Sequence, residues 1–415
     1  MNHSLKIIMP LMPIVGLLVF LVLKSRGLLA NGDPHPHVPC YFIFGDSLMD
    51  NGNNNNLPTQ AKVNFPPYGI DFPDGPTGRF SNGRNIADVI AQLLGFKNFI
   101  PPFATAKDEE IINGVNYASG GAGIRDETGQ HMGSLISFSK QIINHNITIS
   151  QLSSLIANGS LALTRKYLNR CIYTIDMGNN DYINNYFVPK YYQTSRDYTP
   201  AQYAKVLVEQ YSRQLQEIKV KVTLNEVDGK DTYVDKDGLE VVFIFSTKKT
   251  KTLEKFNAQE LYKNGARKFG IFAAGNSGCC PGIMADHGLN TCVESVNNAV
   301  KLFNNHLNNT LYDLNNRFLN AKFILIDDPL VYPNDLNVTD KPCCEVALST
   351  TGKGSCVPNQ VPCNNRQNYY FWDAYHPTER VSIIVGTKAY ETLSPFYNPN
   401  DFSPIKPKKL DYSDA

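Results

Sequence analysis

The sequence lacks several features that would place it in a familiar class at once. Across 415 residues the formal net charge is only +1, so nothing indicates binding to nucleic acid or to an anionic surface. No Gly-x-Ser-x-Gly stretch is present, so the strand–nucleophile–helix turn of α/β-hydrolases is not indicated. Hydrophobic residues make up 42% of the chain and charged residues 19%, which supports one large or two ordinary domains with a sizeable core.

A long apolar run lies at the N-terminus. Lys6 precedes the run from Ile7 to Leu23, and Leu28-Leu29-Ala30 follows a short basic stretch. This pattern predicts a secretory signal peptide over residues 1–30, cut after Ala30. An uncleaved membrane anchor is the alternative, because positive charge also follows the run.

Secretion agrees with the glycan acceptor patterns and with the cysteines. Beyond the predicted signal peptide, four Asn-x-Ser/Thr patterns begin at Asn146, Asn158, Asn308 and Asn337. Nine cysteines are present, and seven of them crowd two loops, at 279–292 and 343–363. In an oxidising compartment they predict disulfide-stapled loops with at least one thiol unpaired within the chain. A zinc site is the alternative, although the spacing fits no standard four-ligand pattern.

Short apolar runs alternate with longer amphipathic stretches. This alternation predicts a parallel sheet covered by helices on both faces, with functional residues at the carboxyl ends of its strands. The predicted strands are 41–44, 171–175, 268–273 and 322–326. The predicted helices are 86–94, capped by Ser81 or Asn82 and stopped by Gly95, then 203–216 and 296–318.

Residues 217–260 do not fit this alternation. Residues 219–224 alternate like an exposed strand, and Asp228-Gly229 and Asp237-Gly238 are hairpin-turn signals. A basic run from Lys248 to Lys251 follows. The segment is therefore a break in composition within an α/β pattern.

Three residues supply the parts of an activated serine nucleophile. Ser47 follows the apolar run 40–44, and Asp373 and His376 lie three residues apart near the other end of the chain. A serine hydroxyl needs a base to take its proton, and a histidine base needs a partner that fixes its tautomer and stabilises its charged form. Taken alone, Gly-Asp-Ser-Leu is more often an ordinary turn, and Asp-x-x-His a cap beside a surface histidine.

The flanking residues make the pattern specific. Four blocks occur in order and resemble those of plant GDSL-type esterases/lipases, within the SGNH hydrolase superfamily. They are Phe-Gly-Asp-Ser-Leu-Met-Asp-Asn-Gly-Asn-Asn (44–54), Gly-Val-Asn-Tyr-Ala-Ser-Gly-Gly-Ala-Gly (114–123), Asp-Met-Gly-Asn-Asn-Asp-Tyr (176–182) and Phe-Trp-Asp-Ala-Tyr-His-Pro-Thr (371–378).

The resemblance implies a fold and a set of roles. The fold is a flavodoxin-like three-layer α/β/α sandwich with a central parallel sheet, spanning 39–396 as one domain. Ser47 matches the nucleophile, His376 the base and Asp373 its orienting carboxylate. Gly120 or Gly121, of which Gly121 is preferred, and Asn180 match the donors of an oxyanion hole. No metal and no organic cofactor are implied.

The activity expected from the resemblance is that of a secreted serine esterase or lipase. It would hydrolyse small-molecule or lipid acyl esters through an acyl-enzyme, as a monomer without stable membrane insertion after signal cleavage and without a nucleic acid partner. The location implied is extracellular, in the plant apoplast or cell wall. An acyltransferase with the same site and a catalytically silent secreted binding protein are the alternatives.

The resemblance also explains why 217–260 is anomalous. In such enzymes a helix like the one ending at Gln216 runs almost directly into a segment like the one that starts at Leu261. We therefore predict that 217–260 is a translated retained intron or a gene-model error, with an inserted hairpin as the alternative.

Overall fold

The computed structural model describes residues 36–216, 225–227, 230–234, 240–243, 265–327, 336–347 and 354–397. The predicted signal peptide, residues 1–30, lies outside the described residues.

Four parallel strands form the central sheet, in the order β1-β2-β6-β7. They are β1 (Tyr41–Gly45), β2 (Ile172–Asp176), β6 (Lys268–Phe272) and β7 (Lys322–Ile326). All four predicted strands are confirmed to within one residue at each end. Beyond β1, a single parallel bridge between Ile43 and Asn116 occupies the place of a fifth strand.

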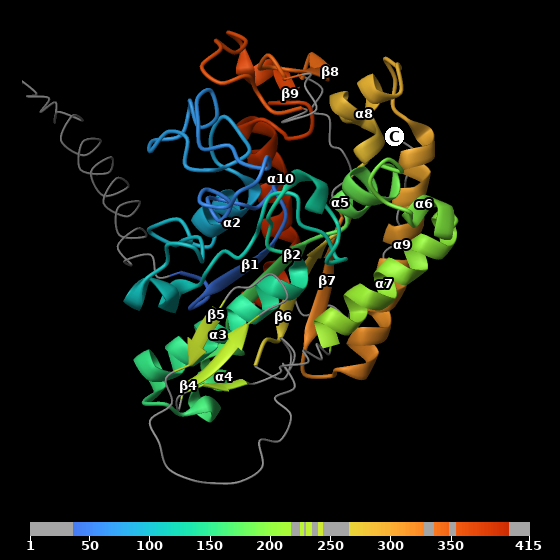
Figure 1. Ribbon diagram of the computed structural model, residues 1–415. Coiled ribbons are helices and arrows are strands. Elements are labelled where there is room, and N and C mark those ends of the chain that lie inside the picture. The colour runs from blue at the N-terminus through green and yellow to red at the C-terminus, as the bar shows by residue number, and fades with distance from the viewer. Residues whose placement is uncertain are drawn as a thin grey trace, which may run out of the picture. The chain divides into compact units, whose positions relative to one another are not determined.

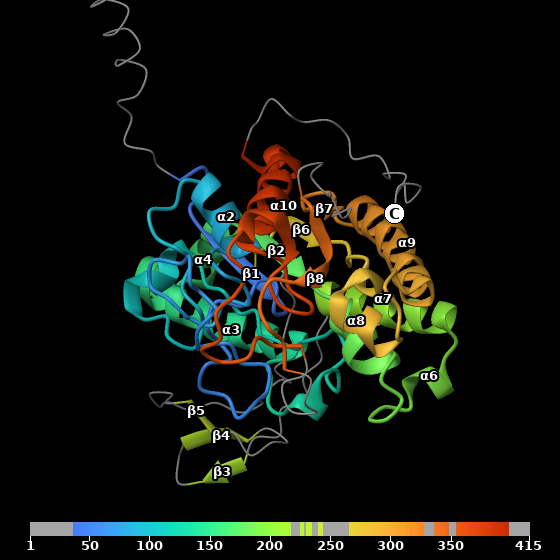
Figure 2. The ribbon, with the colours of Figure 1, turned by 90° about the horizontal axis from the view of Figure 1, so that it is seen from above.

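Helices cover both faces of this sheet and give three layers (Figure 1; Figure 2). Phe42 and Phe44 of β1 belong to one core and Tyr41 and Ile43 to the other, because successive side chains of a strand point to opposite faces. The first core is closed by α3 (Phe138–Ala157), α7 (Pro200–Gln216) and α9 (Glu294–Arg317). The second is closed by α2 (Ile86–Leu93) and α10 (Glu379–Thr392). This is the predicted α/β/α sandwich, and two buried faces explain why the strands are apolar throughout.

The predicted cap of α2 is wrong. Asn85, and neither Ser81 nor Asn82, caps the helix. The Asn85 side chain accepts from the Asp88 N–H at 3.0 Å, and Asp88 accepts from the Asn85 N–H at 2.9 Å, so the two form a capping box. The helix then ends at Leu93, two residues before Gly95.

Shorter elements complete the chain. The helices are α4 (Leu161–Leu168), α5 (Asn179–Asp181), α6 (Thr194–Asp197) and α8 (Pro281–Asp286), and β8 (Val338–Pro342) pairs with β9 (Tyr369–Phe371). Between α7 and β6, the strands β3 (Asn225–Val227), β4 (Lys230–Val234) and β5 (Glu240–Phe243) form a separate antiparallel sheet. The predicted turns at 228–229 and 237–238 and the expected strand at 219–224 lie outside the described residues. The described strands β3 and β4, and β4 and β5, pair antiparallel.

Four disulfides staple the molecule, as the cysteine pattern predicts. They are Cys40–Cys171, Cys279–Cys292, Cys343–Cys363 and Cys344–Cys356, which leave Cys280 as a free thiol. Within the described ranges, none of the helices has both the length and the apolar character needed to cross a bilayer.

Candidate active site

The candidate site lies where the parallel strands end. Ser47 follows β1, Asn180 lies on α5 just after β2, and the turn at 275–277 follows β6. Carboxyl ends of parallel strands share one edge of a sheet, so these segments converge although they are far apart in the chain. The loop after β9 brings Asp373 and His376 to the same edge.

Ser47, His376 and Asp373 form one continuous chain of hydrogen bonds. Ser47 Oγ lies 2.8 Å from His376 Nε2, and His376 Nδ1 lies 2.8 Å from each carboxylate oxygen of Asp373. A histidine bonded to a carboxylate through Nδ1–H presents an unprotonated Nε2 to the serine hydroxyl. The geometry is therefore that of a serine hydroxyl poised to transfer its proton.

Asp373 is held rigidly from several sides. Its carboxylate is fully buried and accepts from the backbone N–H groups of Tyr375 and His376 at 2.9 and 2.8 Å. Tyr68, from a segment with no catalytic signal in the sequence, donates its hydroxyl to Asp373 Oδ2 at 2.6 Å. The ring of Phe80 packs against the His376 imidazole with 4.8 Å between centroids. These contacts fix the histidine ring in the plane that meets Ser47.

The candidate oxyanion donors differ in their availability. The Gly120 N–H donates to the buried Asp50 carboxylate at 2.9 Å, so that group is already engaged. Within the described part of the chain, no hydrogen bond uses the N–H groups of Ser47 or Gly121. Gly121 has φ +81°, a left-handed conformation that favours glycine. Of the two glycines left open by the sequence, Gly121 is therefore the one with an available donor.

Asn180 contacts the nucleophile loop directly. Its Nδ2 donates to Asp46 Oδ2 and to the Ala122 carbonyl, both at 3.0 Å. It thus bridges the residue before Ser47 and the residue after Gly121. Gly178, with φ +128°, permits the turn that carries the chain from β2 into α5.

The neighbours of Asn180 support the site by holding loops around it. Asn179 Oδ1 accepts from the Gly275 N–H at 3.0 Å and the Ser277 hydroxyl at 3.1 Å. The buried Asp181 carboxylate accepts from the N–H groups of Ile124 and Arg125 at 2.8 and 3.1 Å. Both side chains therefore fix neighbouring loops to α5 and do not themselves meet Ser47.

The asparagine-rich run after the nucleophile is a structural clamp. Asn53 Nδ2 donates to the carbonyls of Asn116 and Ala118, and Asn54 Nδ2 donates to the Gly120 carbonyl at 3.0 Å. This run ties the nucleophile loop to the glycine block. The sequence does not indicate these contacts, because the partners lie more than 60 residues away.

A cleft of about 100 Å³ opens beside Ser47 and His376. Apolar side chains line most of it, among them Leu48, Ile183 and Phe272. The free thiol of Cys280 also lines the cleft, but burial raises its pKa to about 12. At neutral pH this thiol keeps its proton and is not a competing nucleophile.

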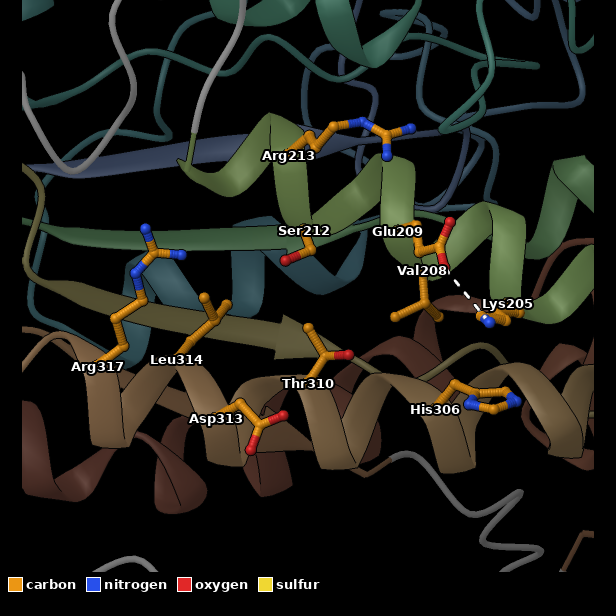
Figure 3. Close-up of a pocket in the computed structure, with 10 residues that line it drawn as sticks. All are labelled: Lys205, Val208, Glu209, Ser212, Arg213, His306, Thr310, Asp313, Leu314 and Arg317. Carbon is orange, nitrogen blue, oxygen red and sulfur yellow. Dashed lines mark ion pairs between the residues drawn. The ribbon is translucent and has the colours of Figure 1, made fainter.

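Two other features, a buried histidine and a larger pocket, differ from this site in their geometry. His145 is buried in the first core, where desolvation lowers its pKa to about 3, and its ring faces Tyr117 rather than a serine. A larger hollow of about 410 Å³ lies between α7 and α9 (Figure 3) and is lined by Ser212, His306 and Asp313 among others. It contains none of the residues that converge on Ser47.

Across the ranges that the structure describes, no group of three or more His, Cys, Asp or Glu side chains is placed to hold a metal ion.

Comparison with known proteins gives one consistent result. Residues 41–388 match the GDSL-like Lipase/Acylhydrolase family. One GDSL esterase/lipase of Arabidopsis thaliana is 38% identical over 387 residues, which cover 91% of this chain and 94% of the relative. Another from the same plant is 41% identical over 386 residues, covering 91% and 93%.

Proposed function

The chain belongs to the GDSL-like lipase/acylhydrolase family and is a carboxylic ester hydrolase, and we propose that it cleaves acyl esters with Ser47, His376 and Asp373 as its catalytic triad. The observation that carries the proposal is the unbroken hydrogen-bond chain from Ser47 Oγ through His376 to Asp373, with 2.8 Å at each step. The apolar cleft beside it suits the acyl part of an ester.

In the first half-reaction, Ser47 Oγ attacks the ester carbonyl carbon while His376 Nε2 takes the hydroxyl proton. The carbonyl oxygen becomes an oxyanion in a tetrahedral intermediate. His376 then gives its proton to the alkoxy oxygen as the carbon–oxygen bond breaks, so that the alcohol leaves and an acyl-enzyme remains. Asp373 keeps the imidazole in the correct tautomer and stabilises its charged form.

The oxyanion needs preorganised donors. The N–H groups of Ser47 and Gly121 and the side chain of Asn180 are the proposed set. The two N–H groups bond to no other described residue, and Asn180 lies against the nucleophile loop. Removal of one such donor typically lowers turnover by ~10²–10³.

In the second half-reaction, His376 takes a proton from water, the resulting hydroxide attacks the acyl carbon, and Ser47 regains its proton. The carboxylic acid is the product. An alcohol in place of water would give acyl transfer from the same intermediate, so product analysis with an added alcohol separates hydrolysis from transfer.

The proposal includes the organisation and location of the protein. Residues 1–30 serve as a signal peptide and 39–396 form one hydrolase domain, with 217–260 as a retained intron or gene-model error. Four disulfides support passage through an oxidising compartment to the extracellular space. The half-buried or exposed positions of the glycan acceptors Asn146, Asn158, Asn308 and Asn337 agree with this route.

The test is hydrolysis of p-nitrophenyl acetate and butyrate by the secreted protein and by Ser47→Ala. We expect Ser47→Ala to lose at least about 10³-fold in kcat, because the nucleophile is absent. Ser212→Ala is the matched control, since Ser212 lies in the larger hollow near His306 and Asp313 (Figure 3). This control should keep wild-type kcat and KM.

Labelling with a fluorophosphonate identifies the reactive serine independently. Mass spectrometry should find the adduct on the peptide that contains Ser47. Substantial activity in folded Ser47→Ala, or an adduct on another serine, would contradict the proposed triad.

A further inference from the structure

Asp46, the residue before the nucleophile, has no role in the mechanism above, yet it is placed at its centre. Its carboxylate is 1% exposed. Oδ1 accepts from the Leu48 N–H at 2.9 Å, and Oδ2 accepts from Asn180 Nδ2 at 3.0 Å. Asp46 therefore contacts both the nucleophile turn and the side-chain donor proposed for the oxyanion.

The Asn180 amide is fully engaged in the structure. One hydrogen of Nδ2 points to Asp46 Oδ2 and the other to the Ala122 carbonyl, while Oδ1 accepts from Asn184 Nδ2 at 2.6 Å. An oxyanion must therefore displace one of the two Nδ2 partners. A bond to an ionised carboxylate is roughly twice as strong as one between neutral groups, so the bond to Ala122 is the weaker.

We propose that Asp46 is a positioning residue for catalysis: it holds one Asn180 N–H throughout the cycle so that the other, directed at Ala122 in the resting enzyme, is delivered to the oxyanion. The inference rests on the proposed function. An amide group is planar, so fixing one N–H and Oδ1 also fixes the direction of the second N–H. Asp46 touches neither substrate nor Ser47 Oγ in this arrangement and acts through Asn180.

The charges around Asp46 make this role sensitive to pH. Desolvation by burial raises the pKa of Asp46 to about 6. The hydrogen bond from the Leu48 N–H and the nearby His376 act in the opposite direction and lower this pKa. Asp181 on α5 and Asp50 on the nucleophile loop raise it further. Asp176, the last residue of β2, pairs in register with Gly45 beside it.

Protonation of Asp46 on the acid side removes the charge from its bond to Asn180. A neutral Asp46 holds the Asn180 N–H less firmly, so this protonation lowers kcat/KM. We expect log kcat/KM of the wild type to fall more steeply between pH 4.5 and 6 than that of Asp46→Asn, which has no carboxylate to protonate at this position.

A double-mutant cycle tests the coupling to Asn180. Asp46→Asn should lower kcat for p-nitrophenyl butyrate about tenfold with KM nearly unchanged. Complete loss of an oxyanion donor lowers turnover ~10²–10³-fold, and a donor that is present but poorly directed should lower it less. In the Asn180→Ala background the same change should lower kcat less than about twofold. The proposal is overturned if Asp46→Asn lowers kcat by the same factor with and without Asn180→Ala and if log kcat/KM of Asp46→Asn falls with decreasing pH as steeply as that of the wild type.

Two further variants separate positioning from simple stability. Asp46→Ser keeps an acceptor for the Leu48 N–H but is too short to reach Asn180, and it replaces Asp46→Asn in the cycle if that variant unfolds. Asp88→Asn removes another buried carboxylate, one that pairs with Arg79 at 2.6 Å, without touching the site. Asp88→Asn should lower the melting temperature but keep the wild-type fall of log kcat/KM between pH 6 and 4.5. Its effect on kcat should be the same with and without Asn180→Ala.

Failure of this proposal is distinguishable from failure of the triad. Activity in Ser47→Ala would overturn both. An inactive Ser47→Ala with an uncoupled cycle would overturn the role of Asp46 alone.

Discussion

The Asp373 carboxylate illustrates how much of the site depends on single side chains from distant segments. Besides His376 Nδ1, it meets two backbone N–H groups of its own loop and the hydroxyl of Tyr68, 305 residues away in sequence. Tyr68 also accepts from the Cys356 N–H at 3.0 Å. One hydroxyl therefore joins the carboxylate to a disulfide loop.

Removing that hydroxyl should weaken catalysis while leaving the triad in place. We expect Tyr68→Phe to lower kcat about tenfold with little change in KM, because a hydrogen bond to a charged group contributes ~1.5–3 kcal/mol and part of that loss falls on the orientation of His376. Tyr41→Phe is the control: it removes a buried hydroxyl that bonds Thr174 at 2.7 Å and does not meet Asp373. It should lower stability but retain kcat, and an equal loss of kcat in both variants would contradict the orienting role of Tyr68.

For single residues, the sequence identifies the reactive side chains better than it identifies the side chains that hold them in place. Ser47, Asp373 and His376 stand in recognisable blocks, and the structure brings them together. Tyr68 and the role of Asp46 leave no signal in the sequence, because each depends on a contact across the fold. Gly121 becomes preferable to Gly120 only when the bond from Gly120 to Asp50 is known.

At the scale of elements, the segment from Cys343 to Cys363 supports the loop that carries Asp373 and His376. The Cys344 N–H donates to the Trp372 carbonyl at 3.0 Å, and the Ala374 N–H donates to the Gly354 carbonyl at 3.0 Å. Two disulfides, Cys343–Cys363 and Cys344–Cys356, brace this segment. The histidine loop is therefore stapled indirectly.

Loss of Cys344–Cys356 should impair both stability and turnover. We expect the double Cys→Ala variant to lose about 3 kcal/mol of unfolding free energy and, below its melting temperature, several-fold in kcat. The pair Cys40–Cys171 serves as the control, because both residues lie at the amino ends of their strands, opposite the site. Its removal should destabilise the protein without lowering kcat; unchanged kcat in the first variant would show that the staple supports folding alone.

Some helices and strands follow from the residues within them, and others do not. The four strands of the central sheet follow from apolar runs, since a strand buried on both faces needs them. The cap of α2 does not follow, because three polar candidates precede the helix and the capping box of Asn85 and Asp88 decides between them. Helices α3 and α10 are missing from the prediction, since their apolar residues are interrupted by buried polar ones such as Gln141, His145 and Ser382.

At the scale of the whole molecule, the described strands between α7 and β6 form a sheet of their own. Strands β3, β4 and β5 pair with one another and with no strand of the central sheet. Among the described residues of 217–260, which are those of β3, β4 and β5, none lines the cleft beside Ser47. The family match, which runs from 41 to 388, continues on both sides of it.

Deleting 217–260, so that Gln216 joins Leu261, should therefore give an active enzyme. We expect kcat/KM within about threefold of the full chain, and a higher yield of secreted protein because the short helix–strand connection is restored. Yield, melting temperature and p-nitrophenyl butyrate hydrolysis check this. A folded but inactive deletion would show that the segment contributes to the site, and an unfolded one that it belongs to the core.

The order of the catalytic parts along the chain has a consequence for biosynthesis. Ser47 emerges early, but Asp373 and His376 lie close to the C-terminal end of 415 residues. With the proposed triad, a nascent chain carries its nucleophile without a base until Asp373 and His376 have been synthesised. On the proposed secretory route, the serine therefore passes the ester-rich membrane in an inert form, and hydrolysis begins only after residue 376 has been added. If the proposed triad is correct, a chain truncated before Asp373 has neither the base nor its carboxylate, and we expect it to be inactive toward esters.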